Sequence, residues 1–228
     1  MKKSLLKVII VSVALISSEN VGFSQGSFFN LNFESPVLPL MRDEEFMVPI
    51  TNGLPGWIGY IDGNQVPRVG FNTIALDSSF ISLHSSASPI FQPLQGSYSV
   101  YLQGGRFSSV SAAIGQTGLV PQTAQSLLFS TVSSGSLQVT FSGLIIPMVL
   151  VSNGPNFSVM GGDISAFAGQ TGELRFTAFN GVGSGLIDAI RFSTSPVPEP
   201  STLALTGIGA LLFGVFGWKN YRPKRNDH

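Results

Sequence analysis

Tyr98-Ser99-Val100-Tyr101-Leu102-Gln103 is the stretch that decides the fold class. Its first, third and fifth side chains are apolar or aromatic, and the residues between them are more polar. This is the period of a strand that buries one face. The same alternation occurs at 137–141 and at 174–178, and turn-forming residues such as those at 95–97 separate the stretches. We therefore predict an all-β fold.

Further strand candidates follow at the spacing of a β-sandwich. They lie at 28–33, 69–76, 80–84, 111–116, 126–132, 144–151, 157–160 and 187–192. No amphipathic helix of normal length interrupts them, and the length of the region suits one domain. We predict that residues 25–195 form two packed antiparallel sheets, a sandwich of the jelly-roll kind.

Composition and charge exclude several classes of function. The chain is 43% apolar and 11% charged, so it can bury a core. Its lysines stand only near the two ends, and no basic stripe crosses the middle, so we predict no nucleic-acid binding. The sequence has no cysteine, which excludes disulfides, thiolate metal sites and cysteine nucleophiles.

The first 24 residues have the pattern of a secretory signal peptide. Three lysines precede Val8, an apolar run follows to Ile16, and Gly22-Phe23-Ser24 has the small-x-small pattern that signal peptidase accepts. We predict export by the secretion machinery and cleavage after Ser24. The alternative is an uncleaved anchor, but an apolar run of about nine residues is short against the roughly 20 that span a bilayer.

The C-terminal residues 196–228 have three successive parts. Val197-Pro198-Glu199-Pro200 comes first, the uncharged stretch 201–218 follows, and the basic residues Lys219, Arg222, Lys224 and Arg225 come last. A helix over 201–218 would be about 27 Å long, enough to cross a hydrocarbon core once. Basic residues stay in the cytoplasm, so residues 25–195 are predicted on the periplasmic side of the inner membrane.

This tripartite tail resembles the PEP-CTERM sorting signal, which is also labelled an ice-binding protein C-terminal domain. The resemblance implies that an exosortase, a membrane transpeptidase, cuts near the Pro-Glu-Pro motif in Gram-negative bacteria that make extracellular polysaccharide. The protein would then be a substrate of that enzyme. The alternative is a plain membrane anchor in which Pro198 and Pro200 only stiffen a linker.

The domain resembles galactose-binding-like jelly rolls at several short motifs in matching order. These are 29–34, 54–57, 114–117 with 120–121, and 186–192. The sequence departs from that family's pattern where a glycine usually precedes Phe33-Glu34 and where a second acidic residue usually follows Asp188. The resemblance implies a structural Ca²⁺ between the first and last strands, held by Glu34 and Asp188. The alternative is that both carboxylates accept backbone hydrogen bonds at strand ends.

The sequence contains no complete catalytic set, and we predict that the protein is not an enzyme. His84 and His228 are its two histidines, and neither an His-x-x-x-His nor a Gly-x-Ser-x-Gly string occurs. His84 is expected to face outward or to end a strand. Asp43, Glu44 and Glu45 form a charge run of the kind that is usually a solvated surface.

Three aromatic residues are candidates for contact with a sugar ring: Tyr60, Tyr101 and Trp57. Trp57 follows a turn and opens a strand, where a core position is the more common outcome. Together these patterns predict an exported, non-catalytic protein of the cell surface or matrix that associates with exopolysaccharide. The alternatives are a carbohydrate-binding or ice-binding module and, as a third reading, a secreted hydrolase.

Overall fold

The computed structural model describes residues 23–24, 27–39, 46–105, 110–133, 137–179 and 183–197. Within these ranges no helix is long and apolar enough to cross a membrane. Most of the predicted signal peptide 1–24, the predicted helix 201–218 and its basic residues lie outside the described part, as do Pro198, Glu199 and Pro200.

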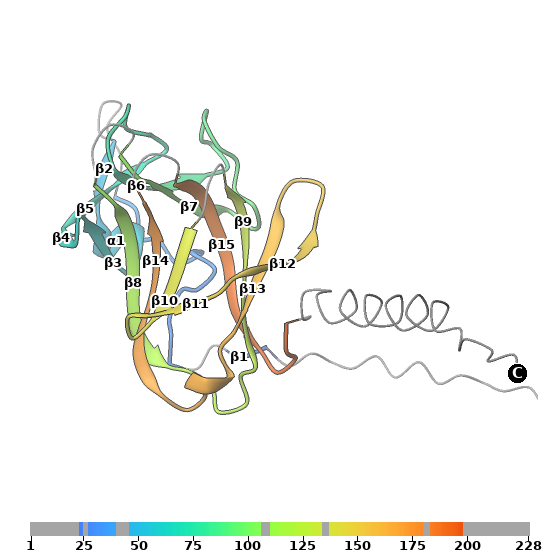
Figure 1. Cartoon of the computed structure of the whole chain (residues 1–228). Helices are drawn as coiled ribbons and strands as arrows, with labels where there is room; N and C mark the ends of the chain where they lie inside the picture. The colour runs from blue at the N-terminus through green and yellow to red at the C-terminus, as the bar shows by residue number, and fades with distance from the viewer. Residues whose placement is uncertain are drawn as a thin grey trace, which may run out of the picture.

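Two sheets pack face to face, which confirms the predicted all-β sandwich (Figure 1). The larger sheet has the order β12 (Val149–Asn153), β13 (Ser158–Asp163), β9 (Ser126–Ser133), β15 (Ser184–Ser193), β7 (Tyr98–Gln103), β6 (Phe80–Ser85), β5 (Arg68–Phe71) and β2 (Met47–Pro49), with β1 (Phe23–Ser24) also paired to β15. The smaller sheet has the order β11 (Leu144–Ile146), β10 (Leu137–Phe141), β14 (Thr171–Ala178), β8 (Ala112–Leu119), β3 (Ile58–Ile61) and β4 (Asn64–Val66).

The chain crosses between the sheets repeatedly, as in a jelly roll. From β7 it passes to β8, β9 and β10, which alternate between the larger and the smaller sheet. The described strand pairs are antiparallel except for β5 and β6, which run parallel. Short helical turns, α1 (Ile50–Gly53) and η1 (Ser165–Phe167), connect strands.

The alternation in β7 places the core as the sequence predicts. Val100 and Leu102 are fully buried between the sheets. Aromatic side chains fill the same layer: Phe176 lies edge-on to both Trp57 and Phe129, with ring centroids 6.4 and 5.1 Å apart. Burial of such large rings is the main stabilising contribution to a core of this kind.

Two predicted strands are wrong. Residues 28–33 form a turn and not a strand, because Asn30 and Phe33 adopt positive φ angles of 53° and 58°. Phe28, Leu31 and Phe33 of this turn are nevertheless buried, whereas Phe29 is 53% exposed, so the hydrophobic pattern reflects burial without sheet pairing. Residues 144–151 form two strands in different sheets. Pro147 stands at the break, where it has no N–H to donate to a ladder.

The outer face of β6 and β7 is covered by residues 86–97, which we call the 86–97 loop. Ser82, His84 and Ser99 point to this face and yet are completely buried. The loop returns over the sheet, where the N–H of Leu94 donates to Ser99 Oγ at 2.8 Å. The predicted outward or strand-end position of His84 is therefore corrected: the side chain faces away from the core, but it is not exposed.

Candidate functional site

Glu34 and Asp188, 154 positions apart in the sequence, hold the same end of the 86–97 loop. Glu34 Oε1 accepts the N–H groups of Ser97 and Tyr98 at 2.8 and 3.0 Å. A side chain at Gly96, whose φ is +58°, would collide with the Glu34 carboxylate. The carboxylate therefore requires glycine at the turn, and it fixes the path of the chain into β7.

Asp188 is 1% exposed and accepts three hydrogen bonds. Its Oδ2 receives the N–H of Gln95 at 2.9 Å and the hydroxyl of Ser99 at 2.7 Å, and its Oδ1 receives the N–H of Ala189 at 2.6 Å. Burial raises the pKa of Asp188 to about 6, although these hydrogen bonds act in the opposite direction. The carboxylate is a buried anchor for the loop.

This arrangement does not fit a Ca²⁺ ion shared by Glu34 and Asp188. Calcium takes six to eight oxygen ligands, whereas Glu34 Oε1 and both Asp188 oxygens already face N–H and O–H donors. No group of three or more His, Cys, Asp or Glu side chains suitable for a metal occurs in the described ranges. The hydrogen bonding supports the alternative reading, in which the two carboxylates are acceptors at strand ends.

Tyr101 belongs to an aromatic cluster under the 86–97 loop. Its ring lies 4.7 Å from Phe91 and 6.0 Å from His84, centroid to centroid. His84 Nδ1 is 2.9 Å from Ser88 Oγ, and burial lowers the pKa of His84 to about 4. Tyr101 is thus a half-buried side chain whose ring already has protein partners. His84 is completely buried.

Trp57 and Tyr60 occupy opposite sides of the smaller sheet. Trp57 is 3% exposed, packs in the core and donates its indole N–H to the backbone oxygen of Asn30 at 3.0 Å, so its ring face is closed to a ligand. Tyr60 lies on the outer face of the sheet but is only 8% exposed. Its hydroxyl donates to Glu173 Oε1 at 3.0 Å, and the guanidinium carbon of Arg175 lies 4.0 Å from its ring centroid.

Tyr60, Glu173 and Arg175, which we call the Tyr60 cluster, form a preorganised polar surface. Arg175 donates from Nε and Nη2 to the two oxygens of Glu173, both at 3.0 Å, which fixes the guanidinium over the ring of Tyr60. Burial, then the hydrogen bond to Glu173, raises the pKa of Tyr60. Glu173 and Arg175 remain 28% and 29% exposed, so their outer edges can meet a ligand.

Sequence reasoning selected Tyr60 but missed Glu173 and Arg175. Alternation in 171–178 places both on the polar face of their strand, and that signal was available. Their position beside Tyr60 could not be predicted from the sequence, because it depends on β8 lying between β3 and β14. Ala113 and Gly115 of β8 face the same side, and a side chain at Gly115 would meet Glu173 Oε1 at 2.5 Å.

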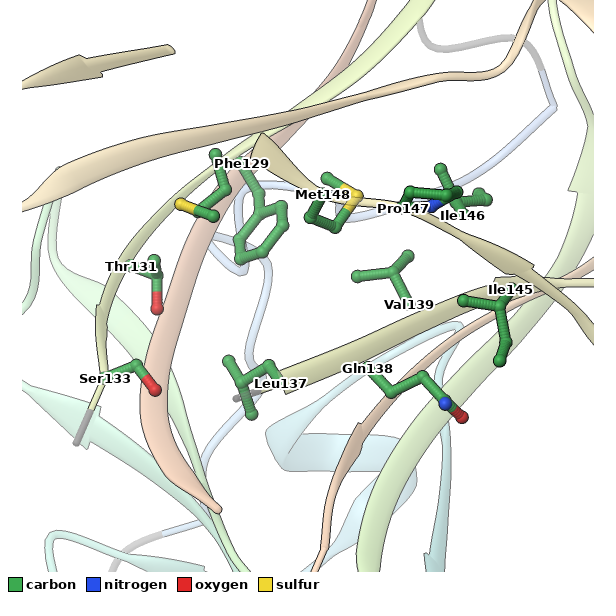
Figure 2. Close-up of a pocket in the computed structure, with 11 residues that line it drawn as sticks. Phe129, Thr131, Ser133, Leu137, Gln138, Val139, Ile145, Ile146, Pro147 and Met148 are labelled. Carbon is green, nitrogen blue, oxygen red and sulfur yellow. The ribbon is translucent and has the colours of Figure 1, made fainter. Parts of the chain in front are cut away.

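An apolar cavity of about 330 Å³ opens between the sheets at one edge of the sandwich. Figure 2 shows Thr131 and Ser133 on one side and Leu137 and Val139 on the other, with Phe129 and Met148 nearby. A second cavity of about 360 Å³ shares Thr131, Ser133 and Met160 with the first. None of the lining side chains of either cavity is charged, so this edge suits an uncharged ligand.

Val197, the first residue of the predicted sorting motif, lies against the outer face of the larger sheet. A Cβ atom at Gly161 of β13 would be 2.5 Å from Val197 Cγ1. The described chain ends here, beside the strands at the lower end of the sandwich (Figure 1). The remainder of the motif and the basic residues of the tail stay predictions from the sequence.

Comparison with known proteins identifies the tail. Residues 196–222 match the PEP-CTERM protein-sorting motif. No curated protein is significantly similar to the chain.

Among solved structures, TmCBM61 in complex with β-1,4-galactotriose is 16% identical, with a TM-score of 0.40 over 74% of this chain and 98% of that chain. The family 11 carbohydrate-binding module from Clostridium thermocellum, in complex with a β-1,3-1,4-mixed-linked tetrasaccharide, is 12% identical, with a TM-score of 0.34 over 64% and 94%. The enzymatically active domain of bacteriophage CBA120 tailspike protein 4 is 14% identical, with a TM-score of 0.34 over 60% and 19%. From its own sequence and structure, then, this chain is an antiparallel β-sandwich followed directly by a PEP-CTERM protein-sorting motif.

Proposed function

We propose that this protein is exported, held at the inner membrane by its tail, cut by an exosortase and delivered to the cell surface or extracellular matrix, where it associates with exopolysaccharide. The observation that carries the proposal is the match of residues 196–222 to the sorting motif. The order of motif, uncharged stretch and basic cluster supports it, because that order orients a single membrane helix with its basic end in the cytoplasm.

The β-sandwich in this proposal is non-catalytic. Burial shifts the pKa of both His84 and Asp188. His84 is completely buried, and Asp188 is 1% exposed and accepts hydrogen bonds from three donors of the protein itself. Both side chains have hydrogen-bond partners within the protein, which supports a non-catalytic role. Their roles are better explained by the packing of the 86–97 loop.

Deletion of Pro198-Glu199-Pro200 tests the sorting function. The full-length protein, with an epitope inserted before Pro196, is expressed in a host that contains an exosortase and in the same host without it. We expect the wild type to be shortened only where the enzyme is present. The deletion variant should accumulate at full length in the membrane, because helix 201–218 supplies the anchoring and the motif only the recognition.

Deletion of Asn226-Asp227-His228 is the matched control, since it removes three tail residues outside the matched range and should leave processing unchanged. If the Pro198–Pro200 deletion were processed and released like the wild type, the exosortase function would be wrong. The tail would then be a plain anchor.

A second candidate function, recognition of a sugar by the sandwich, is favoured by the Tyr60 cluster. Sugar hydroxyl groups need donors and acceptors held at fixed positions, and the planar Arg175–Glu173 pair supplies both. Ala113 and Gly115 of β8 lie beside the pair, and the outer edges of Glu173 and Arg175 stay exposed to solvent. This face, and not Trp57, is where we place sugar contact.

Arg175→Gln tests this candidate. In a glycan array probed with detergent-solubilised full-length protein, we expect about tenfold weaker binding, because a hydrogen bond to a charged group contributes about 1.5–3 kcal/mol. Arg68→Gln, the same change on the larger sheet, should bind like the wild type. Equal binding by both variants would remove the Tyr60 cluster from the site, and ice-recrystallisation activity without glycan binding would favour an ice-binding module.

A further inference from the structure

The chain remains attached to the sandwich after its last strand. The N–H of Gln125 donates to the oxygen of Ser193 at 2.8 Å, and Ser126 Oγ donates to the oxygen of Ser195 at 2.7 Å. Ser126 is 1% exposed, so the donor of this bond is buried. The residues between β15 and the Pro-Glu-Pro motif are thus held against the start of β9, and they are not a free linker.

Val197 is seated in a recess made by a glycine. A Cβ atom at Gly161 would lie 2.5 Å from Val197 Cγ1, 2.6 Å from Val151 Cγ2 and 2.7 Å from Leu128 Cδ2. Gly161 does not have the positive φ that would itself favour glycine. A larger residue at this position would have to displace these side-chain methyl groups, and Val197 occupies part of the space that such a residue would fill.

We call these contacts of Ser195 and Val197 with Ser126 and Gly161 the seat. A sorting enzyme would have to bind Ser195 and Val197 as well. The Cα of Pro198 is about 3.8 Å from that of Val197, so the Pro-Glu-Pro motif starts one residue beyond the seat. A transpeptidase that cuts near this motif must bind the chain on both sides of the bond that it breaks. While Ser195 and Val197 contact the sandwich, their backbone and side chain cannot also enter an active-site cleft.

We propose that the sandwich holds the upstream flank of its own sorting motif, with Ser126 and Gly161 as positioning residues, so that release of residues 195–197 precedes the cut and sets its rate. The proposal rests on the proposed exosortase function. A substrate whose competent form is only a fraction of the population reacts at a rate reduced by that fraction. Folding of the domain therefore slows processing at Pro198-Glu199-Pro200, and loosening the seat accelerates it.

Ser126→Ala loosens the seat without altering the matched residues 196–222. In pulse–chase labelling of the full chain in a host with exosortase, we expect the cut form to appear about fivefold faster, the effect of losing one hydrogen bond. Ser158→Ala is the matched control. It removes a hydroxyl of β13 that bonds Asn153 and does not contact residues 193–197, so its rate should equal that of the wild type.

A disulfide locks the seat. Val197 Cγ1 is one bond from its Cβ, so Cβ atoms at 161 and 197 are no more than about 4 Å apart, within disulfide range. The natural chain has no cysteine, so a Gly161→Cys, Val197→Cys pair has no other thiol in the same molecule to bond, and a non-reducing gel distinguishes the intramolecular bridge from a disulfide-linked dimer. We expect the oxidised pair to remain uncut and each single variant to be cut, with reductant restoring processing of the pair.

Three results would overturn the proposal: Ser126→Ala and Ser158→Ala both cut at the wild-type rate, Ser126→Ala cut more slowly than Ser158→Ala, or the oxidised pair cut as fast as the single variants. In each case, cleavage of the wild-type protein in the host with exosortase would show that the proposed sorting function is correct. A wild type that is not cut at all is the distinct outcome in which the proposed function fails, and this proposal fails with it.

Discussion

At the scale of single residues, His84 is the side chain whose titration should control stability in acid. It is buried, and its Nε2 has no hydrogen-bond partner in the part of the chain that the structure describes. Burial lowers its pKa from 6.5 to about 4, so the folded state holds the neutral ring. Its contribution to stability is complete above about pH 6.5 and is lost as the pH falls toward 4.

Titration of His84 should lower the free energy of unfolding of the wild type by up to about 3 kcal/mol between pH 6.5 and 4. We expect His84→Phe to lack this decrease, because the variant has no imidazole to take up a proton on unfolding. Denaturant unfolding of the full chain at several pH values, followed by tryptophan fluorescence, measures this. His228→Phe at the far end of the chain is the control and should retain the wild-type slope. Parallel pH profiles for both variants would show that His84 titrates normally in the folded protein.

At the scale of elements, the 86–97 loop is the feature that joins distant parts of the sandwich. Glu34 in the segment after the 28–33 turn and Asp188 in β15 both accept N–H groups from it, and Gln95 Nε2 adds a bond to Ser130 in β9 at 2.9 Å. A loop that is bonded to three segments far apart in the sequence should open only with much of the sheet. Its stability should therefore depend on the Asp188 carboxylate.

Asp188→Asn should lower the free energy of unfolding near neutral pH by about 1–3 kcal/mol, because an amide cannot accept all three hydrogen bonds and directs an NH₂ group at donors. Since burial raises the pKa of Asp188 from 3.8 to about 6, the wild type also loses part of its stability as the pH rises through this window, and the variant should lack that component. Hydrogen exchange at the Gln95 amide, faster in the variant, locates the effect.

Melting in the presence of a chelator tests whether a metal ion contributes to the stability of the 86–97 loop. The melting temperature of the wild type in EDTA should equal that in buffer, because Glu34 and Asp188 stabilise the loop through N–H and O–H donors. A melting temperature that falls in EDTA and recovers with Ca²⁺ would contradict this account, since a ligand that binds only the folded state stabilises it.

At the scale of the whole molecule, the domain and the tail carry different information. In the proposed function the tail determines where the protein goes, through its motif, apolar stretch and charges, and the sandwich is the part that is delivered to the cell surface or matrix. Replacing Lys219, Arg222, Lys224 and Arg225 by serine should impair retention at the inner membrane, because these charges orient the helix. Fractionation with the epitope before Pro196 should show mislocalised full-length protein.

The Pro198–Pro200 deletion is the contrasting variant, since it should trap the protein in the membrane and leave its orientation intact. Identical fractionation of the two variants would mean that the charges and the motif do not have separate roles. Retention of the serine variant at the wild-type level would contradict the role of the charges.

Features that depend on residues close together in the chain can be predicted from the sequence alone. Alternation at 98–103, 137–141 and 174–178 predicts strands with one buried face, because the side chains of a strand point to opposite sides in turn. The sorting tail was recognised for the same reason, since its three parts are contiguous. Alternation was misleading at 28–33, where positive φ angles turn a buried segment away from any sheet.

Contacts between residues far apart in the sequence depend on the tertiary structure. Tyr60 and Glu173 are 113 positions apart and become neighbours because β8 lies between their strands. The burial of His84 depends on a loop that returns over its sheet, and the seat of Val197 depends on a glycine in β13. Strand order and register are non-local properties: they follow from how the whole chain buries its apolar faces, which no local pattern of residues specifies.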